Sequence, residues 1–214
     1  MKKYLVLGIL FLLPISVYIF FASGVNNFVK LPVLTENVMP LDSFVAMDQD
    51  TLQFDDKITV LCFFGKEPME LKANAYNLTH KIYKKNYQFK DFQFVVIVPE
   101  GSETQARELK KNLQRVEDAK GWHFGFGTES EIEALHRSLQ TDTQLNDNLA
   151  TSTVFIIDKD GSLRGRNDDE DEGILYGFDS TSIAEINNKM SDDIKVVLAE
   201  YRLALKKYKA NREI

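Results

Sequence analysis

The chain has 214 residues, of which 44% are hydrophobic and 27% are charged, and its formal net charge is −6. This length fits one domain with a small appendage, and the composition excludes a wholly disordered or fibrous chain. The net negative charge argues against nucleic acid as a partner. The single cysteine, Cys62, excludes an intramolecular disulfide, a C-x-x-C redox pair and a cysteine-cluster metal site.

The N-terminus carries an apolar segment. Residues 4–22 are nineteen residues without a charge, close to the roughly 20 residues that span a bilayer core. Lys2 and Lys3 precede them, so the positive-inside rule predicts a cytoplasmic N-terminus and an extracytoplasmic, periplasmic domain. A cleaved signal peptide is the alternative, because Ala22-Ser23-Gly24 offers a small-residue cleavage site. We expect a single-pass anchor over residues 1–23, a spacer over 24–42 and a folded domain over 43–210.

Strands and helices then alternate along the chain. Strands are expected where apolar and β-branched residues run together, and helices where apolar residues recur every three or four positions. In chain order, the pattern predicts a hairpin at 44–54, a strand at 58–64, a helix at 69–85, a strand at 92–98, a helix after Ser102, a strand at 122–126, a helix after Thr128, a loop at 141–150, a hairpin at 153–166 and a long helix from Ser180.

This order predicts the fold class. Alternating strands and helices imply parallel pairing with right-handed crossovers, and the Asp160-Gly161 turn adds an antiparallel strand. Ser102 and Thr128 each begin a capping-box pattern, which indicates a helix start. We therefore expect an α/β, thioredoxin-like fold: a mixed central sheet flanked by helices, with an N-terminal transmembrane helix.

Several motifs resemble those of the Sco/SenC family, the membrane-anchored thioredoxin-like proteins of cytochrome oxidase assembly. Phe44–Asp50 is similar to the family's opening hairpin, and Phe63-Phe64 followed by Pro68 is similar to the end of its first core strand. Gly121-Trp122-His123-Phe124 and the run from Phe155 to Gly165 look like two further family strands. The resemblance implies the fold, the topology and the oxidase-assembly pathway.

The same resemblance implies that the family's active residues are missing. The family places C-P-x-x-C-P just after the first strand, and the two cysteine positions correspond here to Glu67 and Leu71. The family's metal-binding histidine corresponds to Ala150. Because soft thiolates are what select Cu(I), we expect neither copper nor any other cofactor.

Other residues offer little sign of catalysis. Cys62 lies inside an apolar strand, which predicts a buried core residue; a reactive thiol there is the alternative. His80, His123 and His136 form no H-x-x-x-H or comparable pair, so we expect ordinary histidines. Glu67 near a helix start would favour the ionised carboxylate, which suits a helix-start acid better than a general acid.

We therefore expect a non-catalytic binding protein, not an enzyme. Its partners would be the membrane, through the N-terminal helix, and other membrane or extracytoplasmic proteins. The alternative is a copper-binding or thiol-redox protein that uses Cys62 or unorthodox ligands. Aromatic residues cluster between 76 and 94, where helix-to-sheet packing or a partner surface would account for them. The expected interaction surface comprises Lys66, Glu67 and Pro68 together with the acidic run Asp168, Asp169, Glu170, Asp171 and Glu172.

Overall fold

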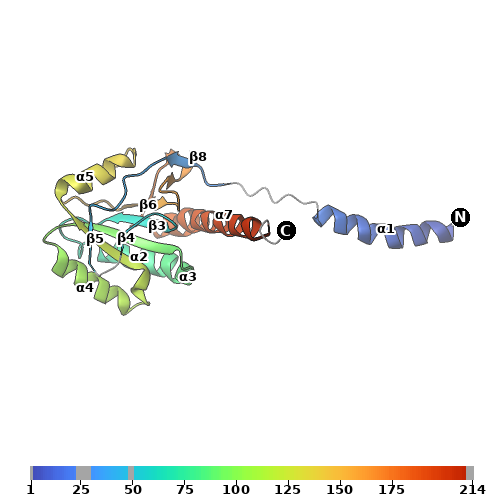
Figure 1. The fold of residues 1–214 in the computed structure, drawn as a ribbon, viewed down its shortest axis with the longest axis horizontal. Coiled ribbons are helices and arrows are strands. Elements are labelled where there is room, and N and C mark those ends of the chain that lie inside the picture. Colours follow the sequence, from blue (N-terminus) through green and yellow to red (C-terminus); the bar gives the residue numbers. More distant parts are fainter. Residues whose placement is uncertain (1, 23–29, 48–50, 211–214) are drawn as a thin grey trace.

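The computed structural model describes residues 2–22, 30–47 and 51–210. Its centre is a mixed β-sheet with helices packed on both faces (Figure 1). The sheet order is β1-β7-β6-β3-β4-β5-β2, and β10 pairs with β6 beside this path. The strands are β1 (Val33–Thr35), β2 (Val45–Ala46), β3 (Ile58–Phe63), β4 (Phe92–Pro99), β5 (Trp122–Gly127), β6 (Thr153–Ile157), β7 (Leu163–Arg164) and β10 (Phe178–Asp179).

Three of these strands form the parallel part of the sheet. β3 pairs in parallel with β4, and β4 with β5, whereas β6 joins β3 in the antiparallel sense. β8 (Arg166–Asp169) and β9 (Gly173–Leu175) make a separate antiparallel hairpin. The predicted α/β fold with a mixed central sheet is therefore confirmed.

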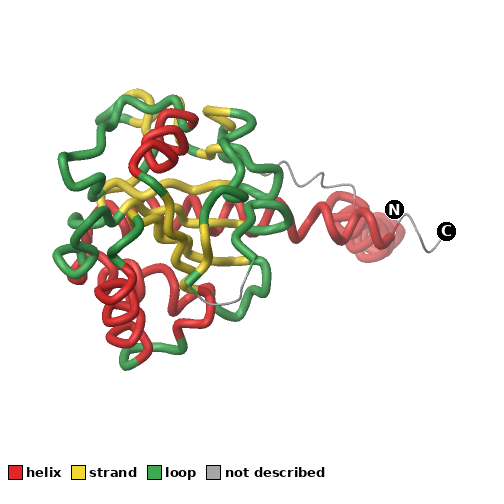
Figure 2. Tube along the Cα trace, turned by 60° about the vertical axis from the view of Figure 1, so that its left-hand side comes forward, coloured by secondary structure: helices red, strands yellow, loops and turns green. Residues whose placement is uncertain are grey.

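The helices join the strands as crossovers and close the chain. Two of them contain a π-helical segment. Figure 2 shows the strands of the sheet in the middle of the domain, with helices and loops around them. The helices are α1 (Lys2–Ala22), α2 (Lys72–Leu78) continued by η1 (Thr79–Tyr83) and α3 (Lys84–Asn86), α4 (Glu103–Gln114), η2 (Ala119–Gly121), α5 (Glu129–Ser138), and α6 (Ile183–Glu185) continued by η3 (Ile186–Met190) and α7 (Ser191–Ala210).

Alternate side chains of each strand enter different cores. In β3, Val60 and Cys62 face a core that includes α2, α4 and α7, whereas Leu61 and Phe63 face a core that includes α5. This alternation follows from the two-residue period of an extended strand. All six residues of β3 and all eight of β4 are buried, as expected for strands covered by helices on both faces.

The N-terminal part of the domain differs from the prediction. Val45 and Ala46 pair with Phe126 and Gly125 of β5 instead of forming a hairpin with residues 51–54. The outer edge of β5 provides the backbone hydrogen-bonding groups for this pairing. Residues 48–50, the expected turn, lie outside the described residues. The described part of the expected spacer also belongs to the domain: β1 pairs with β7, and Leu41 is 1% exposed.

Two helix starts also differ. The sequence places a helix from Met69, but α2 begins at Lys72, after two successive turns in which Glu70 and Lys72 donate to the carbonyls of Glu67 and Met69. Thr128 forms the predicted capping box with Glu131. Ser102 precedes α4 but makes no cap bond, because its hydroxyl donates to the carbonyl of Lys66 instead.

Helix α1 coincides with the apolar N-terminal segment. The large apolar side chains of α1 that the structure describes are exposed, among them Leu10 at 64% and Leu12 at 65%. In the parts of the chain that the structure describes, however, no helix is found that is both long and apolar enough to cross a membrane. The predicted transmembrane helix is therefore not shown by the structure.

Candidate functional site

The loop after β3 meets the segment before β6 at the carboxyl end of β3. Phe64 forms an isolated antiparallel bridge with Ala150, and the amide of Lys66 donates to the carbonyl of Asn148 at 2.8 Å. Gly65 lies between these contacts with a φ of +64°, and a Cβ at Gly65 would be 2.1 Å from the Asn148 oxygen. The structure therefore brings Ala150 next to the loop that carries Glu67, although the two are far apart in the sequence.

Charged side chains of this loop are already paired. Glu67 Oε2 accepts a hydrogen bond from Gln105 Nε2 at 2.6 Å, and Lys66 Nζ lies 2.7 Å from Glu129 Oε1. Gln105 belongs to α4 and Glu129 to α5, so the starts of two helices hold the loop after β3. The oxygen of the same side-chain amide, Gln105 Oε1, is buried without a hydrogen-bond partner among the described residues.

An open cavity of about 520 Å³ lies beside these pairs. It lies at the carboxyl ends of β3, β4 and β5, which is where open α/β sheets commonly bind ligands. Its lining combines acidic and hydroxyl groups with backbone turns, and it contains no cysteine or histidine. The lining residues are Lys66, Glu67, Pro99, Glu100, Gly101, Ser102, Gln105, Gly127, Thr128 and Glu129.

The three positions that match the family's ligands have different surroundings. Glu67 is exposed at the cavity, whereas Leu71 is partly buried against the core at the start of α2. Ala150 is 8% exposed, and its amide donates to Asn146 Oδ1 at 3.0 Å. Pro68, expected at the surface, is buried, and Lys66 is half-buried, so Glu67 is the exposed member of the expected patch.

Cys62 is completely enclosed. It is 0% exposed in the middle of β3, and burial raises the pKa of its thiol above the ordinary value. A reactive cysteine needs a stabilised thiolate and some exposure, and Cys62 has neither. The predicted core role of Cys62 agrees with this placement.

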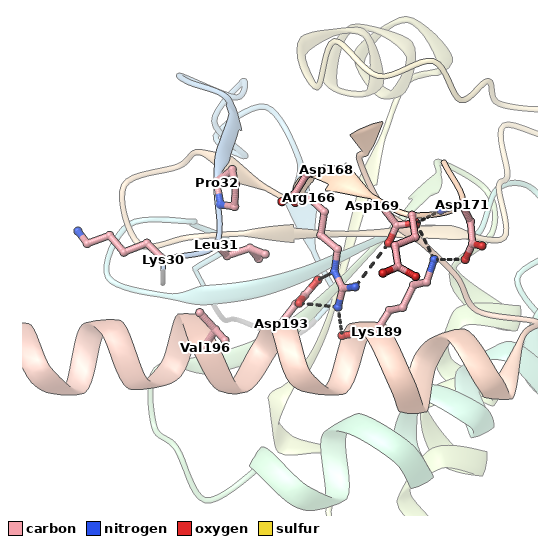
Figure 3. A pocket seen from close by; sticks show the side chains of 11 residues that line it. Lys30, Leu31, Pro32, Arg166, Asp168, Asp169, Asp171, Lys189, Asp193 and Val196 are labelled. Carbon is pink, nitrogen blue, oxygen red and sulfur yellow. Dashed lines mark hydrogen bonds and ion pairs between the residues drawn. The ribbon is translucent and has the colours of Figure 1, made fainter. Parts of the chain in front are cut away.

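Four of the five residues of the acidic run are exposed, but one is buried. Asp169 is buried in β8, with its side chain 2% exposed, whereas Asp168, Glu170, Asp171 and Glu172 are exposed. Asp169 is therefore not accessible as part of the expected interaction surface. The reason is the arrangement of Figure 3: Arg166, at the start of β8, and Lys189, in η3, both pair with Asp169.

These cations form a network between the hairpin and the C-terminal helix. Lys189 Nζ lies 2.7 Å from Asp169 Oδ1 and 2.8 Å from Asp171 Oδ2. Arg166 binds Asp193 through two bonds of 2.8 and 2.9 Å (Figure 3). The Lys189 ammonium lowers the pKa of Asp169, so this carboxylate stays ionised well into acid. The network lines a cavity of about 400 Å³ in which Asp169, Asp171 and Asp193 are paired with Arg166 or Lys189.

The histidines are dispersed. His80 is exposed and His123 is half-buried on β5, while His136 lies edge-on to Phe63 with ring centroids 5.3 Å apart. Burial lowers the pKa of His136. In the described part of the chain, no group of three His, Cys, Asp or Glu side chains is placed to hold a metal ion.

Sequence reasoning missed Gln105, Asp193 and the Arg164 network. Arg164 is buried; it donates to Asp158 at 2.9 Å, to Glu200 at 2.6 Å and to the carbonyl of Leu31 at 2.8 Å. These partners lie up to 133 positions from Arg164 in the sequence, so a local sequence pattern cannot predict the contacts. The one available signal was Arg164 itself, a charged residue within the returning strand of the predicted hairpin.

Comparison with known proteins identifies the fold. No protein-family model and no curated protein matches the sequence. Among solved structures, BsSco, a member of the Sco family of cytochrome c oxidase assembly proteins with a disulfide switch, aligns with a TM-score of 0.56 and 14% identity. The alignment covers 79% of this chain and 98% of BsSco.

Two proteins of Aquifex aeolicus VF5 are similar to about the same degree. A putative electron transfer protein aligns with a TM-score of 0.53 and 16% identity over 77% of this chain and 92% of its own. A putative electron transport protein gives 0.51 and 16% over 77% and 96%. The structure thus matches the thioredoxin-like fold of Sco proteins, and with one cysteine the chain has no C-x-x-x-C redox pair.

Proposed function

We propose that this protein is a membrane-attached, extracytoplasmic Sco-like protein that acts by binding other proteins, without metal or thiol chemistry. The observation that carries the proposal is the state of its sole cysteine. Cys62 is 0% exposed within β3, while the loop positions that resemble the family's two cysteines hold Glu67 and Leu71. The fold therefore provides surfaces that could bind a partner protein, but the chain has no accessible thiolate.

The proposed role lies in cytochrome oxidase assembly. Its support is the likeness to BsSco, which belongs to a family of cytochrome c oxidase assembly proteins. Because folds host many functions, the likeness supports the pathway only as an analogy. The loop at residues 65–70 and the exposed acidic residues of the β8–β9 hairpin are the proposed partner-binding surfaces.

The proposed location rests on the sequence. The uncharged run over residues 4–22, preceded by Lys2 and Lys3, would attach the domain to the membrane and leave it outside the cytoplasm. Two experiments test this location: extraction of isolated membranes with alkaline carbonate and, separately, protease treatment of cells whose outer envelope has been opened. A chain extracted by carbonate, or one protected from external protease once the outer envelope is opened, would contradict it.

The role is tested by deleting the gene in its source and measuring oxidase activity. We expect oxidase activity to fall, and to be restored equally by the natural chain and by Cys62→Ala. Undiminished oxidase activity would contradict the assembly role. Restoration by the natural chain but not by a folded Cys62→Ala variant would instead favour the alternative, a thiol or copper protein that uses Cys62.

A further inference from the structure

A basic and aromatic surface lies apart from the candidate site. Between Leu71 and Lys90 the chain has five lysines and no aspartate or glutamate, although the whole chain has a net charge of −6. This segment folds as α2, η1 and α3 and the loop that leads into β4. It therefore gathers positive charge at the amino end of β4, opposite to the cavity at the carboxyl ends of the strands.

Two aromatic rings are exposed in the midst of this charge. Tyr87 and Phe89 are each 42% exposed, although most aromatic side chains of the domain are buried. Tyr83 is 2% exposed and its ring lies tilted against that of Tyr87, with ring centroids 6.1 Å apart. The core therefore supports the Tyr87 ring, while Tyr87 and Phe89 both remain partly exposed.

The two exposed rings and Lys90 border one small cavity of about 260 Å³. Its charged lining consists of Lys57, Lys90, Lys120 and Asp118, so cations outnumber anions there. Lys120 pairs with Asp118 at 2.8 Å, and Lys57 Nζ donates to the carbonyl of Lys90. Lys84 and Lys85 are exposed on α3, just before the rings.

We propose that this surface, defined as Lys84, Lys85, Tyr87, Phe89 and Lys90, rests on the headgroups of an anionic membrane. The inference rests on the proposed membrane attachment. Lysines near anionic lipid are attracted to the surface, tyrosine rings favour the headgroup level, and phenylalanine buries at the boundary between headgroups and acyl chains. Charge complementarity favours this occupant, since the remainder of the protein is acidic and would be repelled by the same surface.

The arrangement of the fold allows the contact. Figure 1 shows α3 toward the end of the domain from which α7 projects. The larger cavity is lined instead by residues at the starts of α4 and α5, at the carboxyl ends of the strands. A domain seated on α3 would therefore leave the loop after β3 facing away from the lipid, where partner proteins could reach it. The proposed contact thereby gives the attached domain a defined orientation.

The test uses the full chain in lipid nanodiscs, with phosphatidylcholine alone or with an equimolar mixture of phosphatidylcholine and phosphatidylglycerol. Amide hydrogen exchange of residues 84–91 is the measurement. We expect exchange to slow several-fold in the anionic discs, and the difference to disappear in high salt, because salt screens exposed charges. We also expect it to disappear with Lys84→Gln, Lys85→Gln and Lys90→Gln together, or with Tyr87→Ser and Phe89→Ser together.

The matched control removes three exposed cations of α4 and its C-terminus: Arg107→Gln, Lys111→Gln and Arg115→Gln. This variant should keep the difference between the two kinds of disc. Equal exchange in both discs, or a difference that survives the lysine substitutions, would overturn the inference and leave an acidic protein as the occupant. A chain that is not retained in any disc would instead contradict the membrane attachment itself, and the inference would fall with it.

Discussion

Gly65 and Ala150 lie in direct apposition: a Cβ placed on Gly65 would be 2.9 Å from the Cβ of Ala150. The contact ties the loop after β3 to the segment before β6, and the positive φ of Gly65 lets the loop turn there. The candidate site is therefore shaped by backbone packing as well as by its side chains.

The first prediction follows from this packing. Gly65→Ala should lower the free energy of unfolding by about 2–4 kcal/mol, because the left-handed backbone and the crowding by Asn148 both oppose a side chain. Gly161 is a matched control, since its φ is +70° and nothing lies within 4 Å of its Cβ position. Gly161→Ala should cost about 1–2 kcal/mol in the same denaturant titration. Equal losses for both variants would contradict the crowded packing.

The second prediction concerns the buried ion pair of Arg164 and Asp158. Their side chains are 4% and 3% exposed, so removing one partner leaves an uncompensated charge. Arg164→Met should lower the free energy of unfolding by about 3–5 kcal/mol. Lys195 and Asp192 make a pair of 2.7 Å at the surface, and Lys195→Met should cost less than about 1 kcal/mol. A loss for Arg164→Met as small as that for Lys195→Met would show that the buried pair is not formed.

The third prediction is a pH dependence in acid. The pKa of Asp169 is lowered by Lys189, so the folded state binds protons less readily than the unfolded state at this residue. Its stabilising contribution is complete above the ordinary aspartate pKa of about 3.9 and is lost as the pH falls through the lower folded value. Asp169→Asn should therefore destabilise by about 1–3 kcal/mol at neutral pH and progressively less in acid.

Asp168 provides the control for this prediction, because it is the exposed neighbour of Asp169 in the same strand. Asp168→Asn should change stability by no more than about 0.5 kcal/mol at any of these pH values. Thermal unfolding followed by circular dichroism over the acid range gives both curves. If the loss from Asp169→Asn were independent of pH, its carboxylate would not be the stabilising group.

The fourth prediction concerns a milder pH range. Burial lowers the pKa of His136, so the folded state disfavours the charged ring. The contribution of His136 is complete above the ordinary histidine pKa of about 6.5, and stability declines as the pH falls from there toward the folded value. His136→Phe should remove this decline, while His80→Gln, at an exposed position, should retain it. A decline of the same size in His136→Phe would assign the effect to another group.

The fold could be predicted from the sequence because its signals are local. The apolar runs that became β3, β4 and β6 and the Thr128 capping box each depend on a few neighbouring residues. The prediction was wrong where strand pairing depends on segments that are far apart in the sequence. Val45 and Ala46 pair with β5 and not with the residues that follow them, and β1 joins the sheet through β7.

The candidate site shows the same division. The burial of Cys62 was predictable because an uninterrupted apolar strand surrounds it. The burial of Asp169 was not, because its partner Lys189 lies 20 positions away on the segment that leads into α7. Gln105 likewise lies 38 positions from Glu67, and only the folded chain brings the two together.

The most direct test of the account is Cu(I) binding by the full-length protein in competition with a colorimetric chelator. The natural chain and Cys62→Ala should both leave the copper with the chelator, because Cys62 is enclosed and no other soft thiolate is present in the sequence. Tight one-to-one binding by the natural chain that a folded Cys62→Ala variant loses would contradict the account, since it would show an accessible copper ligand where we infer a buried core residue.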